Sequence, residues 1–493
     1  MRKKVVAALL FIACTGNVIG QNVVDGAFVY DLDGYITAAL ERSNEIKNAK
    51  SRYLSAYWDY RSYKASFLPS LNLRATLPEF KNTIDPYQDG GSVKYSPTNY
   101  ITENLTLSID QQVGFTGGKF SLESNIQRRD DFLAKTTTYK SLPIAVAYSQ
   151  NLFGINWLKW QKQIDPIRYE EARRNYLFQK ESVILSAISY FFDLAIAQQN
   201  LQIAKTNLNN ADTLYKISQG RYRLGSISES DLMQMELTKL NAESALSQRL
   251  LDLEDRQNKF RSYLGINEKK DIKLIVPSKI PNMVLSYDKV LEQARLNNPD
   301  IVRFNRQILE AERWLEENKK QTGFSASLNA KIGFNQNSFE FVDSYKGLKP
   351  SQTASITISM PILDWGNRRG KIKMAESNLD LVKGQVEQSE IDFEQNIYFR
   401  VMRFNMMGQK YQIASKADTI AQMRYKVTMN RFIAGKISVL DLNTALNEKD
   451  NANSNFVYTM KDFWWFYYEL RRVALYDFEK GSKLETDYDS LIR

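Results

Sequence analysis

The chain has 493 residues, one cysteine, no histidine and a formal net charge of +10. This composition excludes zinc sites of the Cys/His kind, an intrachain disulfide and every histidine-based catalytic triad. An enzyme could still use carboxylates, but no carboxylate pair and no phosphate-binding loop stand out, so we predict no enzyme, no catalytic residue, no metal site and no cofactor. Basic and acidic residues are interleaved, which favours a solvated helical surface over a nucleic-acid site.

The N-terminus carries an export signal. Basic residues at positions 2–4 precede a short apolar run at 5–13, which predicts a secretory signal peptide over 1–20 and Gln21 as the first mature residue. Its removal leaves a charge of 10 − 3 = +7. Lipidation at Cys14 is the alternative. No later segment is expected to be a membrane helix, so any membrane contact would have to use β-strands.

Two similar series of elements follow along the chain. Each half is predicted to contain a helix, a β region, a long helix, a sharp turn and a further helix. In the first half these elements are a helix at 31–66, β-structure at 69–153, and helices at 165–218 and 228–263. In the second half they are a helix at 286–319, β-structure at 324–363, and helices at 370–430 and 438–475.

The β regions show an alternation of apolar and polar residues. In the stretch SLNLRATL, Leu71, Leu73, Ala75 and Leu77 alternate with polar residues, and 324–335 repeats the pattern. Period two predicts strands with one apolar and one polar face, and about ten residues suffice to cross a membrane. The first half also contains an additional hairpin around Gly117 and Gly118.

The long helices carry a heptad seam. Apolar residues spaced three and four apart predict close packing along the helix axis. At 1.5 Å per residue, some 50–60 residues span about 75–90 Å, so such a helix needs partners along its length. The first seam comprises Ala187, Tyr190, Leu194, Ala197, Leu201, Ala204, Leu208, Ala211 and Tyr215. The second comprises Phe404, Met407, Tyr411, Ala414, Ala421 and Tyr425.

One stretch of twelve residues occurs twice, 431 − 221 = 210 positions apart: RYRLGSISESDL from Arg221 and RFIAGKISVLDL from Arg431. In both copies a glycine is suited to end a helix in the left-handed conformation. Three residues later a serine can cap the next helix, with an aspartate completing the capping box. The repeat therefore predicts two helical hairpins that reverse at the same end of the molecule.

These two motifs resemble the TolC family of outer-membrane efflux channels. Two further stretches, which lie where each half passes from strand to long helix, carry the same resemblance: NLFGINWLKWQ and PILDWGNRRGK. The resemblance implies an α+β membrane protein with an internal duplication. Three protomers would share an outer-membrane β-barrel that continues as a long periplasmic α-helical coiled-coil barrel. In the family each protomer supplies four strands, twelve per trimer, a count that the additional hairpin around Gly117 and Gly118 does not fit simply. The protein would lie in the outer membrane and extend into the periplasm.

The same resemblance implies a passive exit duct of a tripartite efflux or type I secretion system. Its partners would be two further copies of the chain, outer-membrane lipid, a periplasmic membrane-fusion adaptor and an inner-membrane pump of the RND or ABC type, with no nucleic acid. The alternative is an exported coiled-coil spacer or adhesin without a pore. An enzyme using carboxylates comes third.

The resemblance also implies roles for the repeated residues. The adaptor-docking tip would comprise Leu224, Gly225, Ser226, Ile227, Ala434, Gly435, Lys436 and Ile437. The aperture or gate would comprise Arg221, Asp231, Arg431 and Asp441. The tyrosine and arginine of the family's gate latch are replaced here by Phe432 and Ile437, and Thr444 stands where a second acidic ring would lie.

The duplication divides the chain into five expected segments. These are the signal peptide at 1–20, a first repeat at 21–264, an equatorial linker at 265–285, a second repeat at 286–475 and a C-terminal equatorial tail at 476–493. Within the last helix, the aromatic stretch DFWWFYYELRR at 462–472 is expected to pack between helices.

Overall fold

A computed structural model of the chain describes residues 22–24, 27–89, 91–268, 271–277 and 279–492. The predicted signal peptide and Cys14 lie outside these residues. The chain forms two compact units, each assembled from both halves of the sequence. The helical unit comprises the described residues within Met1–Arg52, Arg174–Asn298 and Asp392–Arg493, and the sheet unit comprises those within Tyr53–Arg173 and Pro299–Ile391.

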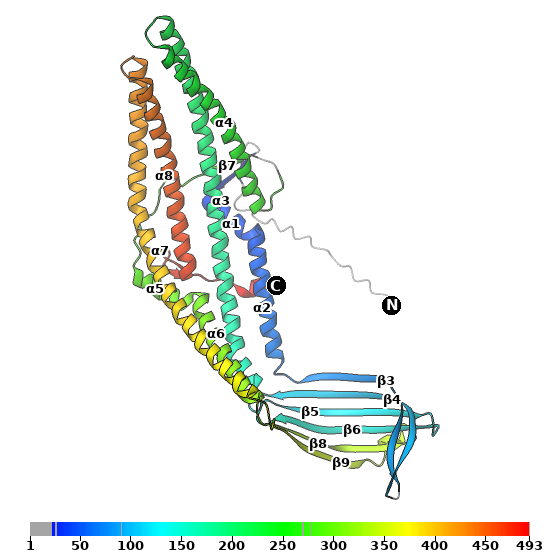
Figure 1. Ribbon diagram of the computed structural model, residues 1–493. Helices are drawn as coiled ribbons and strands as arrows, with labels where there is room; N and C mark the ends of the chain where they lie inside the picture. Colours follow the sequence, from blue (N-terminus) through cyan, green and yellow to red (C-terminus); the bar gives the residue numbers. More distant parts are fainter. Residues whose placement is uncertain (1–21, 25–26, 90, 269–270, 278, 493) are drawn as a thin grey trace, which may run out of the picture. The chain divides into compact units, whose positions relative to one another are not determined.

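The sheet unit contains one six-stranded antiparallel sheet whose strands lie side by side in chain order (Figure 1). The additional hairpin predicted around Gly117 is confirmed, because Val113 pairs with Gly118 across its turn. The protomer's sheet therefore has six strands rather than the four of the family, as the additional hairpin indicated. The strands are β3 (Ser70–Asp89), β4 (Ser92–Val113), β5 (Gly118–Asp131), β6 (Thr136–Asn151), β8 (Ser325–Ser338) and β9 (Lys349–Ser359).

The strand register gathers the apolar residues on one face. Leu71 lies opposite Ile109, which lies opposite Leu122, and the row continues through Val146 to Ile332. All five side chains are exposed in the protomer. The other face is polar, with Asn72 donating to Asp110 at 2.9 Å and Lys331 paired with Glu123 at 2.5 Å. An apolar face left open beside a polar one is the pattern of a sheet that borders lipid on one side and water on the other.

Two of the predicted helices are interrupted. The helix expected at 31–66 is α1 (Leu32–Arg42) and α2 (Asn44–Ala65), separated at Ser43, whose hydroxyl accepts from the Ile46 N–H at 3.3 Å. The helix expected at 286–319 is α5 (Tyr287–Asn297) and α6 (Pro299–Gln321). Asn298 is extended because the ring of the following proline disfavours the helical conformation of the residue before it.

The four long helices form two hairpins, α3 (Trp157–Arg223) with α4 (Glu229–Tyr263) and α7 (Asn367–Ile433) with α8 (Val439–Ala474). Both α3 and α7 contain 67 residues, in agreement with the duplication. The expected start of α3 near residue 165 was wrong. The helix begins at Trp157, where the Asn156 side chain accepts from the Lys159 N–H at 3.0 Å, and it includes Pro166.

The predicted seams are largely buried. In α3, Ala187, Leu194, Ala197 and Leu201 are buried, whereas Leu208 is half-buried. Contrary to expectation, α3 contains one 18-residue stretch that is apolar and long enough to cross a membrane. Because 67% of that stretch is buried inside the structure, it has the environment of a core helix in a bundle.

Short elements complete the helical unit. The linker expected at 265–285 contains β7 (Ile272–Ile275), which pairs in parallel with β2 (Ala27–Asp31), and β1 (Asn22–Val24) pairs with β2. Packing of the C-terminal aromatic stretch between helices is confirmed by the burial of Phe463 and Tyr467. The remaining elements are a 3-10 turn at Asp343–Tyr345 in the sheet unit, and β10 (Tyr476–Asp477), β11 (Ser482–Lys483) and α9 (Tyr488–Ile492) in the helical unit.

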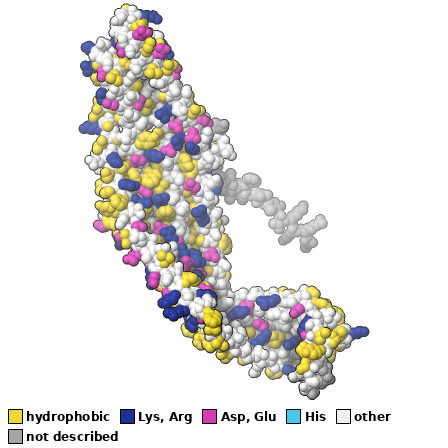
Figure 2. Space-filling view, viewed as in Figure 1, with side chains coloured by type: hydrophobic (Ala, Val, Ile, Leu, Met, Phe, Trp, Pro, Cys, Tyr) yellow, Lys and Arg dark blue, Asp and Glu magenta, His cyan; other side chains and the backbone are white. Residues whose placement is uncertain are grey.

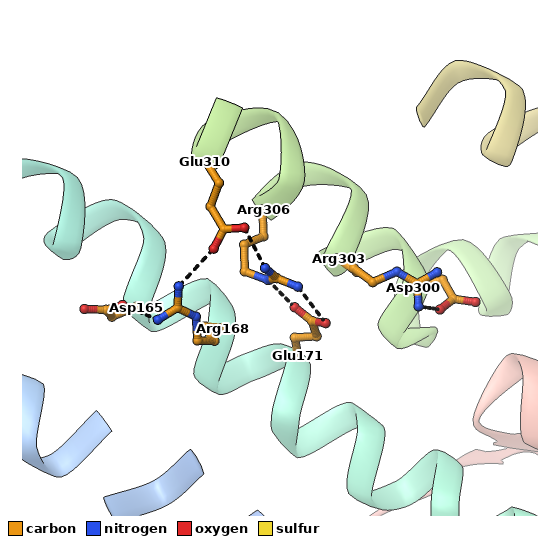
Figure 3. Close-up of polar contacts among 7 residues, drawn as sticks. All are labelled: Asp165, Arg168, Glu171, Asp300, Arg303, Arg306 and Glu310. Carbon is orange, nitrogen blue, oxygen red and sulfur yellow. Dashed lines mark hydrogen bonds and ion pairs between the residues drawn. The ribbon is translucent and has the colours of Figure 1, made fainter. Parts of the chain in front are cut away.

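Ion pairs join α3 and α6 within the sheet unit (Figure 3). The Arg306 guanidinium donates to both carboxylate oxygens of Glu171, at 2.6 and 3.2 Å, and to Glu310 at 2.8 Å. Arg168 donates to the second oxygen of Glu310 at 2.9 Å. Burial raises the pKa of Glu310, but the hydrogen bond from Arg168 and the charge of Arg306 outweigh it, so the pKa lies below its ordinary value.

We predict that Arg306→Met destabilises the protein by about 1–3 kcal/mol, because Glu171 keeps only 11% of its side-chain exposure and would lose both donors. Arg303 is the matched control on the same helix. It pairs at 2.8 Å with Asp300, but both side chains are more than a third exposed, so Arg303→Met should cost less than about 1 kcal/mol. Thermal unfolding of the two variants measures the difference, and equal losses would contradict the prediction.

Candidate functional site

The two copies of the repeated motif form the same turn at the end of the helical unit. Gly225 and Gly435 have φ of +67° and +73°, the left-handed conformation that favours glycine. The Ser226 N–H donates to the Arg221 carbonyl and the Lys436 N–H to the Arg431 carbonyl, both at 2.9 Å. With the bonds from the glycine N–H groups to residues 222 and 432, these contacts complete a Schellman motif in each hairpin.

Each turn is followed at once by a capping box. The Ser228 hydroxyl accepts from the Asp231 N–H at 3.1 Å, and the Asp231 carboxylate accepts from the Ser228 N–H at 3.3 Å. Ser438 and Asp441 do the same at 3.2 Å for both bonds. The hydrogen bonds from Ser438 hold the pKa of the Asp441 carboxyl below its ordinary value. The predicted helical hairpins and caps are thus confirmed.

Arg221 joins the two hairpins. Its guanidinium donates to the carbonyl oxygens of Phe432 at 3.1 Å and Ile433 at 2.6 Å, and it lies 5.4 Å from the centre of the Phe432 ring. A cation at the last carbonyls of α7 is favourably placed with respect to the helix dipole. Among the described residues, the equivalent Arg431 side chain has no hydrogen-bond or ion-pair partner. The repeat therefore places two similar arginines in different environments.

Beneath the turns, apolar residues of both hairpins form one buried cluster. Phe432, which stands where the family latch has a tyrosine, is 3% exposed and is part of this cluster. Ile437 is half-buried and packs against it. The other buried members are Leu214, Met235, Tyr425, Val439, Leu442 and Ala445. Further along the hairpins the contacts are polar, with Asn207 donating to Asp450 at 2.6 Å and Asn210 to the Tyr425 hydroxyl at 3.1 Å.

The sequence-predicted tip residues differ in exposure. Leu224 is 81% exposed, and Gly225, Ser226, Ala434, Gly435 and Lys436 are also exposed. Ile227 and Ile437 are half-buried, so they support the turns from below. Of the four predicted aperture residues, Arg431 and Asp441 are exposed and Arg221 and Asp231 are half-buried.

Sequence reasoning missed three exposed apolar residues at the tips. Leu440 is 74% exposed, and Ile433 and Tyr222 are more than 40% exposed. Leu440 falls in the first turn of α8 between buried Val439 and buried Leu442, a position that the buried side of a helical seam does not include. An apolar residue outside the seam of its own helix was the signal in the sequence that could have identified Leu440 as exposed. Basic and acidic side chains are interspersed along the hairpins, as predicted (Figure 2).

Comparisons with known proteins agree with this arrangement. Residues 119–266 match the family model described as outer membrane efflux protein. No curated protein matches the chain by sequence. The CmeC outer-membrane channel of Campylobacter jejuni has a similar structure, with 16% identity, a TM-score of 0.66 and coverage of 94% of this chain and 88% of CmeC.

Two further solved structures share the fold. The MtrE outer-membrane channel of Neisseria gonorrhoeae, solved in its open state, has 15% identity, a TM-score of 0.59 and coverage of 92% of this chain and 90% of MtrE. The outer-membrane protein VceC of Vibrio cholerae has 15% identity, a TM-score of 0.58 and coverage of 92% and 97%. The family resemblance found from the sequence motifs is thereby confirmed.

Proposed function

We propose that this protein, which is similar to the outer membrane efflux protein family over residues 119–266, is the exit duct of a tripartite efflux or type I secretion system. It is a protein of the outer membrane that extends into the periplasm. The observation that carries the proposal is the six-stranded sheet, which leaves a whole apolar face exposed while its other face is polar. An exported spacer or adhesin without a pore has no use for such strands, whereas a lipid-facing barrel requires them.

The duct is a homotrimer in this proposal. A single protomer presents an open sheet whose outermost strands are β3 and β9. Strands within lipid must be closed on themselves or on another chain, because no water is available to pair their backbone groups. Cargo then passes through the assembled protein by diffusion, and an inner-membrane pump supplies the energy.

Fractionation tests the location and assembly together. The mature protein should separate with the outer membrane and migrate as a trimer in mild detergent. A protein found only as a soluble periplasmic monomer would contradict both the channel and the trimer. Trimers that separate with the outer membrane but conduct no ions in planar bilayers would favour the spacer or adhesin instead.

The hairpin tips are the proposed docking surface for a periplasmic membrane-fusion adaptor. The exposed apolar side chains of Leu224 and Leu440 support this docking surface, because a partner that covers them removes apolar surface from water, which is favourable. The exposed backbone of both glycine turns allows a partner to approach closely. Three protomers would present six such tips.

A second proposal, independent of adaptor docking, concerns the two aspartates of the capping boxes. The Asp231 and Asp441 carboxylates accept from the N–H groups of the capping serines in one protomer, and threefold symmetry would also gather six carboxylates around the aperture. We predict that the double variant Asp231→Asn with Asp441→Asn changes single-channel conductance and weakens block by divalent cations, because a ring of carboxylates attracts cations to the pore mouth. Asparagine can still accept the capping hydrogen bond, so stability should change by less than about 0.5 kcal/mol. Unchanged conductance and unchanged block would leave capping as their whole role.

A further inference from the structure

The two edge strands of the sheet have unpaired backbone groups on their outer sides. β3 pairs only with β4 and β9 only with β8 among the described strands. Both strands carry exposed apolar side chains, Leu71 and Leu73 on β3 and Ile356 and Ile358 on β9. Because lipid offers no hydrogen-bond partners, the free edges of these strands must be paired. Since β3 and β9 do not pair with each other in the protomer, strands of another chain are their partners in the proposed assembly.

Strand direction makes a second copy a suitable partner. Ser70 at the start of β3 pairs with Asp110 near the end of β4, and the alternation continues to Ser359 at the end of β9. With six antiparallel strands, β9 runs opposite to β3. When copies are related by rotation around a common axis, β9 of one copy is therefore antiparallel to β3 of the next. An odd number of strands would bring these edges together in parallel.

The register of the closing pair follows from the sheet. A row drawn straight across the strands from Ser70 passes Asp110, Ser121, Ala147 and Lys331 and reaches Thr353 on β9. The strand itself ends at Ser359, which is 359 − 353 = 6 residues further. Pairing of Ser70 with Ser359 joins the two strands at the ends from which they enter and leave the sheet.

This register gives a strand tilt within the range of known membrane barrels. The pairing is displaced by six residues along the strand for every six strands crossed. With a rise of roughly 3.3 Å per residue along a strand and a spacing of roughly 4.8 Å between neighbouring strands, this displacement gives a strand tilt of about 35°. Membrane barrels have tilts of about 35–45°. A closing pair shifted inward to Thr353 would have no stagger, and strands without stagger cannot close into a barrel of this kind.

The side chains also match in this register. Leu71 falls opposite Ile358, and Leu73 falls opposite Ile356, on the apolar face. Asn72 falls opposite Thr357 on the polar face. A slip of one residue would set apolar side chains against polar ones along the whole contact, so the pattern specifies the pairing.

We propose that three copies of the chain close one barrel of 3 × 6 = 18 strands, in which residues 70–76 of one copy pair with residues 353–359 of the next. The proposal rests on the proposed trimer and adds its strand number and interface. The additional hairpin thus lies in the wall of the barrel. Since barrel diameter grows roughly linearly with strand number, the barrel is about one and a half times as wide as the twelve-stranded barrel that the family resemblance implied.

The alternative is a twelve-stranded barrel from which β3 and β4 are excluded, so that β9 pairs with β5 of the next copy. In the protomer, however, β4 and β5 pair without a bulge from Tyr100–Asp131 to Val113–Gly118. Excluding the hairpin would break this ladder and expose a β5 edge in lipid. The uninterrupted ladder therefore favours the eighteen-stranded barrel.

Disulfide trapping in the full-length protein can distinguish the two barrels. Cys14 is the only native cysteine and is replaced by serine in all variants. The pair Asn72→Cys with Thr357→Cys places cysteines directly opposite each other across the proposed interface, and oxidation should link most protomers into covalent trimers on denaturing gels. Arg74→Cys with Ser355→Cys is a second pair at the same interface. Asn72→Cys with Thr353→Cys is the matched control, because its two positions are four residues apart in register, about 13 Å.

A third arm tests the alternative directly. Ser121→Cys with Thr357→Cys should link only if β9 meets β5 of a neighbouring copy, and trimers formed by this pair would overturn the eighteen-stranded barrel while leaving the channel intact. Native trimers that none of the pairs links would overturn the proposed strand pairing. Loss of the trimer in the parent protein, measured in mild detergent without oxidation, would instead contradict the proposed function.

Discussion

Leu201→Asp should prevent trimer assembly. Leu201 is 8% exposed in the middle of the α3 seam, between buried Ala197 and buried Ala204. An aspartate at this position would be an unpaired charge in an apolar contact, which costs roughly 3–5 kcal/mol per protomer. Since the same change occurs in every protomer, the assembled protein loses this free energy once for each copy. The amount of detergent-resistant trimer measures the effect.

Two neighbouring positions make the test specific. Gln202, one residue further along α3, is exposed, so Gln202→Asp should assemble normally and report any general effect of an added charge. Leu208 is half-buried in the protomer, and we expect Leu208→Asp to block assembly as well, although with less loss of protomer stability. Normal assembly and transport by Leu201→Asp would show that the heptad assignment is wrong.

Local interactions made the hairpin motif predictable. The Schellman bonds and the capping box of each tip join residues no more than five positions apart, so the types and spacing of Gly225, Ser228 and Asp231 determine the turn almost alone. The contact of Arg221 with the end of α7 could not be predicted in this way. Its partners Phe432 and Ile433 are more than 200 positions away, and nothing in the local pattern distinguishes Arg221 from Arg431.

The sheet shows a similar limit. Alternation in residues 70–77 and 324–335 predicted the strands at the ends nearest the helices, where most of the register is regular. Further out, the pairing of β3 with β4 shifts between Thr76 and Glu79, and Pro86 lies opposite Tyr95. A bulge changes which face each later residue occupies, so period-two alternation is lost although the strand continues. The full length of the β3–β4 hairpin therefore became visible only in the structure.

Gly435→Trp should abolish most export while leaving the trimer folded. Gly435 is exposed at the apex of the second hairpin, where a partner is proposed to dock. Its φ of +73° costs a residue with a side chain about 1–2 kcal/mol, a small fraction of the stability of a hairpin packed along its whole length. A Cβ added here would lie 3.5 Å from the Arg221 guanidinium, which is ordinary contact, so the exposed apex has room for a side chain, and an indole there would occupy part of the proposed docking surface.

Gly435→Asn separates bulk from backbone strain, because asparagine tolerates the left-handed conformation and is much smaller than tryptophan. We expect this variant to keep most of its export, and both variants to run as trimers in mild detergent. Export by cells and recovery of the native adaptor with the purified channel should fall together for Gly435→Trp only. If the tryptophan variant forms trimers and exports as well as the asparagine variant, the apex of the second hairpin is not the docking surface. If both variants lose export equally, export depends on the glycine conformation of the turn and not on the bulk of the side chain at its apex.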